Sequence, residues 1–443
     1  MSERRFLSWI FAVALGLAAL AAALCWAVDP YLVFGQARFA GFNHIKPVVT
    51  THEPMMKAYQ ASRACGKTLI IGSSRSGIGL DPSGPAWPQA MQPVYNLSVA
   101  GTNLHDALLL LNMLLAHCQP DRLPTTLVVG LDFESFLSQV RPATAPQPVA
   151  NDADQQQAER LQALARRTSG GLLQPGLLWR DAATSLLTVS ALVDSLATLR
   201  ASQRAAGPNL LPGGNSSEWQ LQAWTQADGA GALFHQKHLL TARRFAKPHQ
   251  LGVAPDGAIR GMAAVSAMLG LAAQHKMAVK MAVQPSHVSH HELIDALGHW
   301  PDFDRWKHAL ADAAHHARQR GMDVTVWDFG GYEADYLQPV PARGDRRAAM
   351  AAFWDPVHYN AMLGQRITAA WIGAPAAPTV ASASASASES ALGAELRPET
   401  VAQRVFQVRQ ARERWRSANP QALADAQRYR CAVQACPGNA RLH

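Results

Sequence analysis

A short apolar run at residues 68–71 ends in Gly72, Ser73, Ser74 and Arg75. An apolar run closed by turn residues is typical of a buried parallel strand. Open α/β folds bind their ligands at the carboxyl ends of the strands, so this segment would present a serine hydroxyl at such an edge. A serine attacks an acyl carbon only beside a base that is itself held by an acid. The chemistry to look for is therefore acyl transfer or ester hydrolysis.

A candidate acid and base lie close together much later in the chain. His358 follows Asp355 by three residues, and Pro356 restrains the loop between them. An acid at this spacing can turn back and hold the imidazole ring. The spacing alone is a weak signal, but the pair follows the last predicted strand and precedes an amphipathic segment at 362–371. This position favours a base at the same edge of the sheet.

The negative charge that develops on an acyl oxygen needs hydrogen-bond donors. The backbone N–H groups of Ser74 and Gly101 are candidates, because each follows a predicted strand where the chain turns into a helix. Glycine also allows close approach of a substrate to the backbone. A second interpretation is that Ser73 and Ser74 only cap the following helix, which is a common role of serine.

Five apolar runs predict the strands that would position these residues, and helix-favouring segments alternate with them. The predicted strands are 68–71, 94–99, 126–131, 278–283 and 323–329. The predicted helices include 104–116, 261–275, 303–320 and 362–371. Alternation of strand and helix is typical of a parallel sheet covered on both faces. The sequence therefore predicts the α/β class.

Residues 6–28 carry no charge and follow Arg4 and Arg5. About 20 apolar residues span a bilayer, whereas the core of a signal peptide has roughly 7–15. Positive charge before the run favours a cytoplasmic N-terminus. We expect a single-pass anchor in the cytoplasmic (inner) membrane, with the main domain on the periplasmic side. A cleaved signal peptide, cut near alanines 21–23, is the alternative.

The chain divides into four predicted parts. Residues 1–30 form a cytoplasmic tip and anchor, 31–373 the main domain, 374–392 an Ala/Ser/Pro-rich linker and 393–443 a basic helical tail. Within the main domain, residues from about 139 to 249 differ in character and are interpreted as a helical insertion. The Ala/Ser repeat of the linker is typical of flexible connections.

Net charge and composition limit the classes of molecule that the chain could bind. The 443 residues carry a formal net charge of +8, and many of the arginines lie in the tail. A basic tail can contact anionic lipid, an acidic polymer or nucleic acid. No nucleic-acid-binding motif accompanies the tail, so we expect no nucleic-acid partner and favour a solvated helical face.

Four cysteines outside the anchor offer two pairings. Cys65 and Cys118 each precede a predicted strand, and Cys431 and Cys436 would close a small loop. Both pairings suit an oxidising compartment, but spacing alone does not settle the connectivity.

Three histidines, His287, His290 and His291, invite a metal interpretation. No cysteine or carboxylate at metal-ligand spacing joins them, so we favour a polar loop and expect no metal. The chain has no phosphate-binding loop and no dinucleotide fingerprint, so we expect no cofactor.

The serine and histidine segments belong to a larger pattern, which resembles the four blocks of the SGNH (GDSL-like) hydrolase superfamily. In order, these blocks are Gly72-Ser73-Ser74, Gly101, Gly130-Leu131-Asp132 and Asp355-Pro356-Val357-His358. The resemblance covers roughly residues 67–371, except the insertion. It implies a three-layer α/β/α sandwich with a mainly parallel, flavodoxin-like sheet. Members of the superfamily hydrolyse or transfer acyl groups, and membrane-anchored members acylate exported polysaccharides and wall polymers.

Carried over by motif position, the resemblance implies Ser74 as the nucleophile, His358 as the base and Asp355 as its orienting acid. It also implies Gly101 as an oxyanion donor. Two positions depart from the pattern: Ser73 replaces the usual Asp of the first block, and Asp132 replaces the usual Asn of the third. An ionised carboxylate accepts hydrogen bonds and repels an oxyanion. Either Arg75 or another partner holds Asp132 in a structural role, or the site is weak or inactive.

Two functions follow as expectations. The first is an extracytoplasmic SGNH-like serine esterase or O-acyltransferase that acts on acyl esters of an envelope or exported polysaccharide. The second is a catalytically inactive scaffold of the same fold that binds a glycan or a protein partner of the envelope.

Overall fold

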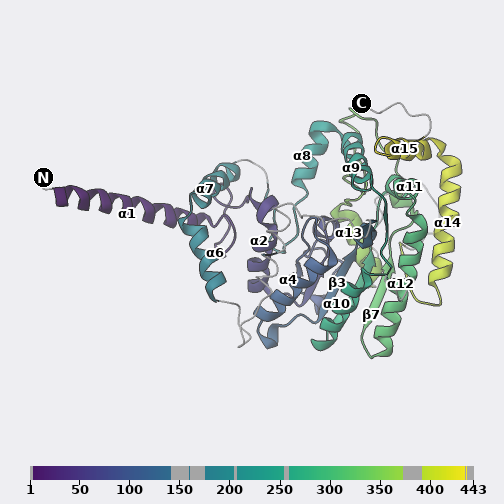
Figure 1. The fold of residues 1–443 in the computed structure, drawn as a ribbon, viewed down its shortest axis with the longest axis horizontal. Coiled ribbons are helices and arrows are strands. Elements are labelled where there is room, and N and C mark those ends of the chain that lie inside the picture. The colour runs from purple at the N-terminus through teal and green to yellow at the C-terminus, as the bar shows by residue number, and fades with distance from the viewer. Residues whose placement is uncertain are drawn as a thin grey trace. The chain divides into compact units, whose positions relative to one another are not determined.

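The computed structural model describes residues 3–140, 175–203, 207–253, 259–372 and 392–434, together with residues 159 and 436. The chain forms two compact units, whose elements are labelled in Figure 1. The first unit comprises residues 1–65, 109–122 and 150–219, and the second comprises 66–108, 123–149 and 220–443. Each unit is described by itself below.

The second unit is built on a mixed but mostly parallel sheet of six strands in the order β2-β1-β3-β6-β7-β8. The strands are β1 (Thr68–Ile71), β2 (Val94–Asn96), β3 (Thr126–Leu131), β6 (Ala278–Val283), β7 (Val324–Asp328) and β8 (Ala394–Glu395). The first five run parallel, and β8 pairs antiparallel with β7. Every residue of β1 and β3 is buried, as continuous apolar runs in a parallel sheet should be.

Helices and short elements complete the second unit. The helices are α3 (Ser74–Gly79), α8 (Trp219–Asp228), α9 (Ala230–Arg244), α10 (Met262–Gln274), α11 (Val288–Ala296), α12 (Trp300–Gln319), α13 (Ala361–Ile372), α14 (Val401–Ala418) and α15 (Pro420–Cys431). Helix α4 (Leu104–His117) begins in this unit and ends in the first. A two-stranded sheet pairs β4 (Leu137–Gln139) with β5 (His249–Leu251). Single 3-10 turns lie at Gln89–Met91, Phe133–Phe136 and Ala334–Tyr336.

The segment after residue 391 belongs to the second unit. Strand β8 completes the sheet, and Arg404 of α14 donates to the buried Asp328 at 3.0 Å from Nε. Lys307 of α12 lies 2.9 Å from the same carboxylate. Three further arginines of α14 also meet acidic side chains: Arg409 pairs with Asp304, Arg412 with Asp295, and Arg416 with Glu292 and Asp295. This face of α14 is therefore paired within the unit, not solvated as the sequence suggested.

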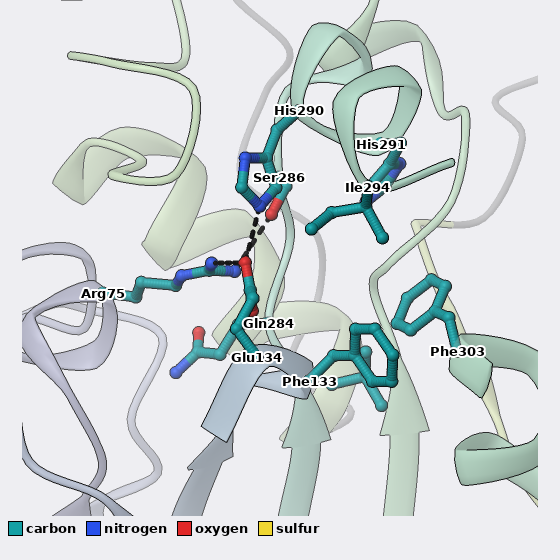
Figure 2. Close-up of a pocket in the computed structure, with 10 residues that line it drawn as sticks. Arg75, Phe133, Glu134, Gln284, Ser286, His290, His291, Ile294 and Phe303 are labelled. Carbon is teal, nitrogen blue, oxygen red and sulfur yellow. Dashed lines mark hydrogen bonds and ion pairs between the residues drawn. The ribbon is translucent and has the colours of Figure 1, made fainter. Parts of the chain in front are cut away.

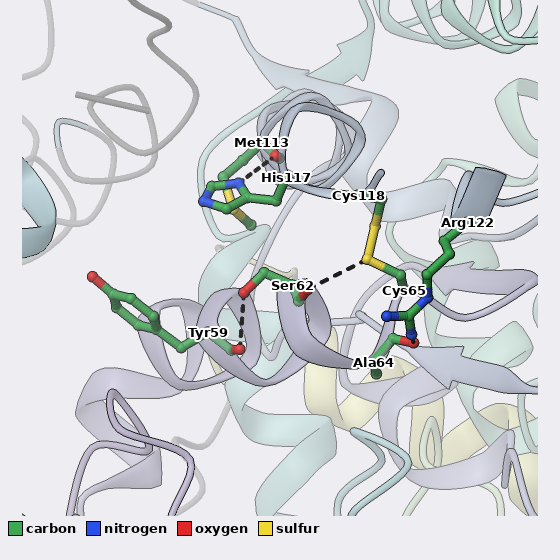
Figure 3. Close-up of a disulfide and its surroundings, with 8 residues drawn as sticks. All are labelled: Tyr59, Ser62, Ala64, Cys65, Met113, His117, Cys118 and Arg122. Atoms are coloured by element: carbon green, nitrogen blue, oxygen red, sulfur yellow. Dashed lines mark hydrogen bonds between the residues drawn. A yellow bond between two sulfur atoms is a disulfide. The ribbon is translucent and has the colours of Figure 1, made fainter. Parts of the chain in front are cut away.

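The first unit contains α1 (Glu3–Val28), α2 (Val49–Ala64), α6 (Pro175–Leu187), α7 (Val189–Ser202) and a 3-10 turn at Pro120–Arg122. Helix α1 is, on its own, long and apolar enough to cross a membrane. A disulfide joins Cys65 at the end of α2 to Cys118 (Figure 3). In the second unit Cys431 is bonded to Cys436, so both pairings left open by the sequence are formed.

Several boundaries differ from the sequence-based expectation. Strand β2 ends at Asn96, three residues earlier than expected. Residues 97–99 are irregular in conformation, although the backbone N–H groups of Leu97 and Val99 still donate to the Ile70 and Gly72 carbonyls. The linker predicted at 374–392 lies outside the described residues except for Leu392. Of the insertion predicted at about 139–249, residues 141–158, 160–174 and 204–206 also lie outside them.

Candidate active site

Ser74 is the first residue of α3 and follows the carboxyl end of β1. Its neighbour Ser73 is the N-cap of this helix, and the Ser73 Oγ accepts a hydrogen bond from the Arg75 backbone N–H at 3.2 Å. Capping is therefore done by Ser73, which leaves the Ser74 hydroxyl available for another partner.

The partner of Ser74 is His358. The Ser74 Oγ lies 2.8 Å from the His358 Nε2, and the His358 Nδ1 lies 2.6 Å from the Asp355 Oδ2. The second carboxylate oxygen, Asp355 Oδ1, accepts backbone N–H groups of Val357 and His358, each at 2.9 Å. Three residues from two distant segments thus form one continuous hydrogen-bonded chain. This is the geometry that activates a serine hydroxyl.

Electrostatics keep Asp355 ionised. Burial alone would raise the pKa of this carboxyl group. The charge and hydrogen bond of His358 outweigh burial, and Lys237 and the Val357 N–H add to them, so the pKa of Asp355 is held well below its ordinary value. An ionised Asp355 fixes the His358 tautomer and stabilises an imidazolium when one forms.

A buried chain of side chains lies beneath Ser74 and ties α3 to the loop of the histidine. The Tyr359 hydroxyl donates to the Gln284 Oε1 at 2.7 Å, and the Gln284 Nε2 donates to the Ser76 Oγ. Gly130 of β3 makes room for this arrangement, since a Cβ atom there would clash with the Gln284 Nε2. The loop that carries His358 is therefore anchored to the helix that carries Ser74.

The site opens into a cavity of about 420 Å³. Its lining comes from six separate segments of the second unit and includes Ser73, Ser74, Gly101, Thr102, Asn103, Asp132, Glu134, Ser135, Lys237, Thr241, Arg244, His290 and His358. A cavity of this size is in the range of small-molecule sites.

Backbone donors line the same cavity. Within the described residues, neither the Ser74 N–H nor the Gly101 N–H donates to another protein group. Gly101 has φ of +73°, a left-handed conformation that a residue with a Cβ atom rarely adopts. Asn103 adds a third donor: its Oδ1 accepts the Asp106 backbone N–H at 3.0 Å, and its Nδ2 group has no acceptor among the residues described.

Asp132 lies in the cavity beside Arg75. The Arg75 Nε is 3.4 Å from the Asp132 Oδ1, and the Arg75 Nη2 is 2.6 Å from the Glu134 Oε1. Burial raises the pKa of Asp132 and the charge of Glu134 adds to the increase, while Arg75 opposes it. Arg75 thus holds two carboxylates at once, which is the structural role that the sequence left open for Asp132.

A buried cluster surrounds the Arg75 guanidinium (Figure 2). Arg75 also donates to the Ser286 Oγ at 3.0 Å, and the His290 Nε2 lies 2.5 Å from the Glu134 Oε1. Burial opposes ionisation of Glu134, but Arg75 and His290 together hold its pKa well below the ordinary value. The Arg75 guanidinium next to Asp132 is therefore held in place by Glu134 and Ser286.

Five of the six residues predicted from the sequence line this cavity: Ser74, Arg75, Gly101, Asp132 and His358. The sixth, Asp355, is bonded to the His358 Nδ1. Glu134, Ser286, His290, Asn103 and Lys237 were not predicted. Glu134 follows Asp132 by two residues at the end of a strand, which is a signal that could have marked it. The others have no local pattern, because only the fold brings them to the site.

The sequence suggested a polar loop for the three histidines of the metal interpretation. In the structure they lie on helix α11 or at its start. His287 is the N-cap of α11, and His290 and His291 are buried on that helix. The Nδ1 of His287 lies 2.7 Å from the Ser289 Oγ, while His290 bonds Glu134. Within the part of the chain that the structure describes, no group of three or more His, Cys, Asp or Glu is placed to hold a metal.

No family model, no curated protein and no solved structure matches this chain.

Proposed function

We propose that this chain is an SGNH-like serine esterase or O-acyltransferase that acts on acyl esters of an envelope or exported polysaccharide. The observation that carries the proposal is the hydrogen-bonded chain from Ser74 through His358 to Asp355. The order of the parallel strands, β2-β1-β3-β6-β7, supports a flavodoxin-like arrangement, in which ligands bind at the carboxyl ends of the strands. Ser74 follows one of these ends.

In the proposed reaction, the Ser74 Oγ attacks the acyl carbon of an ester and forms a C–O bond, while its proton passes to the His358 Nε2. The carbonyl electron pair moves onto the oxygen, where the N–H groups of Ser74 and Gly101 and the Asn103 amide would stabilise it. When the oxyanion collapses, the ester bond breaks, and His358 returns the proton to the leaving alkoxide. The product is an acyl group on Ser74.

A second half-reaction releases the acyl group. A water molecule or a sugar hydroxyl loses its proton to His358 as it attacks the acyl carbon, and Ser74 leaves with that proton. Water as the acceptor makes the protein an esterase, and a sugar hydroxyl makes it an acyltransferase.

Two cations of the cavity lining favour a substrate with negative charge near the ester. Lys237 and Arg244 of α9 line the cavity, and neither has an ion-pair partner among the described residues. The carboxyl groups of Asp132 and Glu134 are already engaged by Arg75. Unpaired cations in a cleft attract anionic ligands, and carboxylated or phosphorylated glycans are of this kind.

The proposed location is the periplasmic side of the inner membrane, with one membrane crossing at residues 6–28. The length and apolarity of α1 support a crossing. The two disulfides, Cys65–Cys118 and Cys431–Cys436, support an oxidising compartment.

The test uses the full chain in detergent, an activated acetyl ester and a fluorophosphonate label. We expect ester turnover and labelling by the parent chain, and loss of both in Ser74→Ala. Ser83→Ala is the matched control, because Ser83 is an exposed serine outside the cavity. A chain that shows neither turnover nor labelling sensitive to Ser74→Ala would refute the catalytic proposal.

An inactive scaffold that binds a glycan or an envelope protein is the alternative, and Asp132 is the observation that favours it. Its carboxyl group lines the cavity at the position where the superfamily usually offers an amide donor. Glycan binding that persists in both Ser74→Ala and His358→Ala, together with absent turnover in the parent chain, would establish the scaffold.

A further inference from the structure

Helices α6 and α7 of the first unit have their polar and apolar faces reversed. The side chains buried on them are small or polar: Asp181, Ser185, Ala191, Ser195, Thr198 and Ser202. Five large apolar side chains are exposed: Trp179, Leu187, Val189, Val193 and Leu196 are 75%, 72%, 78%, 57% and 50% exposed. Leu186 and Leu192 are partly buried. A helix on the surface of a soluble domain shows the opposite pattern. Exposed apolar side chains and buried polar ones, as on α6 and α7, are expected where a helix is surrounded by an apolar medium.

Several of the inner polar groups are hydrogen-bonded within the unit, whereas the buried Thr198 hydroxyl has no hydrogen-bond partner among the described residues. The Ser195 Oγ donates to the Ala191 carbonyl at 2.7 Å, and the Tyr59 hydroxyl donates to the Asp181 Oδ2 at 2.8 Å. The Tyr31 hydroxyl also donates to Asp194. Small residues and buried hydrogen bonds at helix contacts are typical of helices packed within a membrane.

The length of α1 fixes the depth of these helices. Residues 3–20 of α1 are exposed, whereas most of residues 21–28 are partly or fully buried. At 1.5 Å per residue the exposed part extends about 27 Å, which is short of the hydrocarbon core of about 30 Å. If α1 spans a bilayer, its covered last turns therefore also enter the bilayer.

Helices α6 and α7 cover these last turns. Cys25 of α1 and Ala191 of α7 belong to one buried cluster, against which Leu186 of α6 packs. In Figure 1 both helices lie at the C-terminal end of α1, and its N-terminal part projects away from them. The exposed apolar side chains of α6 and α7 are thus at the depth where α1 meets the bilayer.

The two helices meet at a sharp corner. They are bent by 67° at Thr188, whose Oγ accepts the Ala191 backbone N–H at 3.1 Å. Leu187 and Val189 form the corner, and both are strongly exposed. Exposed arginines lie on the two arms away from the corner, Arg180 on α6 and Arg200 on α7. Arginine side chains near a membrane extend to the headgroups, so this order places the corner deepest.

We propose that the α6–α7 corner, residues 178–200, inserts into the lipid bilayer beside α1 and contacts phospholipid acyl chains. The partner is lipid because the reversed faces continue the apolar surface of α1. The first unit then holds the chain to the membrane by two elements, of which only α1 crosses. This inference does not depend on the chemistry proposed for Ser74.

The experiment measures depth in the full chain, reconstituted in phosphatidylcholine nanodiscs. A single cysteine is placed at Val189, Val193, Leu15 or Phe406 and labelled with the fluorophore NBD, and lipids with nitroxide on the acyl chain act as quenchers. The parent chain, whose free Cys25 is buried, gives the blank. Leu15 is exposed on α1, and Phe406 is the matched control because it is an exposed apolar residue of the second unit.

We expect acyl-chain quenching at residues 189 and 193 that approaches quenching at residue 15 and is several-fold greater than at residue 406. Quenching at 189 and 193 no greater than at 406 overturns the proposal. A blue-shifted emission at 189 without lipid quenching also overturns it, because it indicates a second copy of the chain over this face. Absent quenching at residue 15 overturns it too, since the depth of the corner rests on insertion of α1.

Discussion

Replacing Asp355 by asparagine separates the catalytic role proposed for this residue from its structural role. Asparagine keeps the Oδ1 that accepts the backbone N–H groups of Val357 and His358, each at 2.9 Å. It places an NH₂ group where the Oδ2 lies 2.6 Å from the His358 Nδ1. The Nδ1 must then accept, so the Nε2 carries the proton and faces the Ser74 hydroxyl as a donor. Asp355→Asn therefore keeps the loop and removes the base.

The size of the effect follows from these bonds. A base locked in the wrong tautomer lowers kcat by about 10⁴ in serine hydrolases. Three charge-assisted hydrogen bonds become neutral, and a neutral bond contributes about 1 kcal/mol less, so the free energy of unfolding should fall by about 2–3 kcal/mol. Because the pKa of Asp355 is lowered in the folded chain, this contribution is present at neutral pH and is lost as the pH falls below about 4.

Ester turnover and denaturant unfolding of Asp355→Asn are measured at pH 7 and at pH 3.5. Asp81→Asn is the matched control, because the Asp81 Oδ1 also accepts a backbone N–H in a turn, outside the cavity. The reasoning fails if Asp355→Asn retains more than a tenth of the parent turnover. It fails equally if the stability difference between Asp355→Asn and the parent is larger at pH 3.5 than at pH 7.

Three other variants test the proposed oxyanion donor, the buried ion pair and the disulfide of the first unit. Asn103→Asp keeps the Oδ1 that caps α4 and removes the Nδ2 donor, so kcat should fall about 10²-fold with no change in thermal unfolding; an unchanged kcat would contradict its role. Arg75→Met removes the guanidinium that pairs with the buried Glu134, so the free energy of unfolding at pH 7 should fall by about 3–5 kcal/mol. This cost should shrink below about pH 4 as Glu134 takes up a proton, and a cost independent of pH would count against the pair. Serine at both Cys65 and Cys118, 53 residues apart, should lower stability by about 4 kcal/mol, whereas a loss under 1 kcal/mol would show that the bond adds little.

Much of the central sheet could be predicted, because its strands are short apolar runs closed by glycine or polar residues. The bounds of β1, β3 and β6 agree with the predicted strands. Strand β8 could not be predicted, since its two residues have no period of their own and pair only through contacts with β7. A buried strand is recognised in the sequence by its apolar run, and β8, at the edge of the sheet, has none.

Helix α2 shows why the rest of the fold was hidden. Its segment contains Pro54 and mixes polar, charged and apolar residues, so it has no clear helical period. Within the folded unit Lys57 is fully buried and lies 2.9 Å from Glu53, one helical turn earlier. A buried ion pair gives the pattern of an exposed helix, and only tertiary packing distinguishes the two.

Like the fold, the site has residues that the sequence could predict and residues that it could not. Ser74, Asp355 and His358 were predicted because each stands in a short local pattern. Glu134 and His290 were not, because they meet across 156 residues, and no spacing encodes such a contact. Local motifs identify the groups proposed to react, whereas the groups that hold them are found only in the folded chain.

In the proposed reaction, the two aspartates of the site, Asp132 in the cavity and Asp355 beside His358, show how an acid can occupy the place expected for an oxyanion donor. The pKa of Asp355 is lowered by its contacts with His358, whereas burial raises the pKa of Asp132. Carboxyl groups whose pKa values are pushed in opposite directions perform different tasks in one site. Asp355 stays ionised and supports the imidazolium. Asp132 takes up a proton more readily than an ordinary aspartate, and a protonated carboxyl group donates a hydrogen bond instead of repelling an oxyanion. When Asp132 is ionised, the adjacent Arg75 guanidinium offsets its charge.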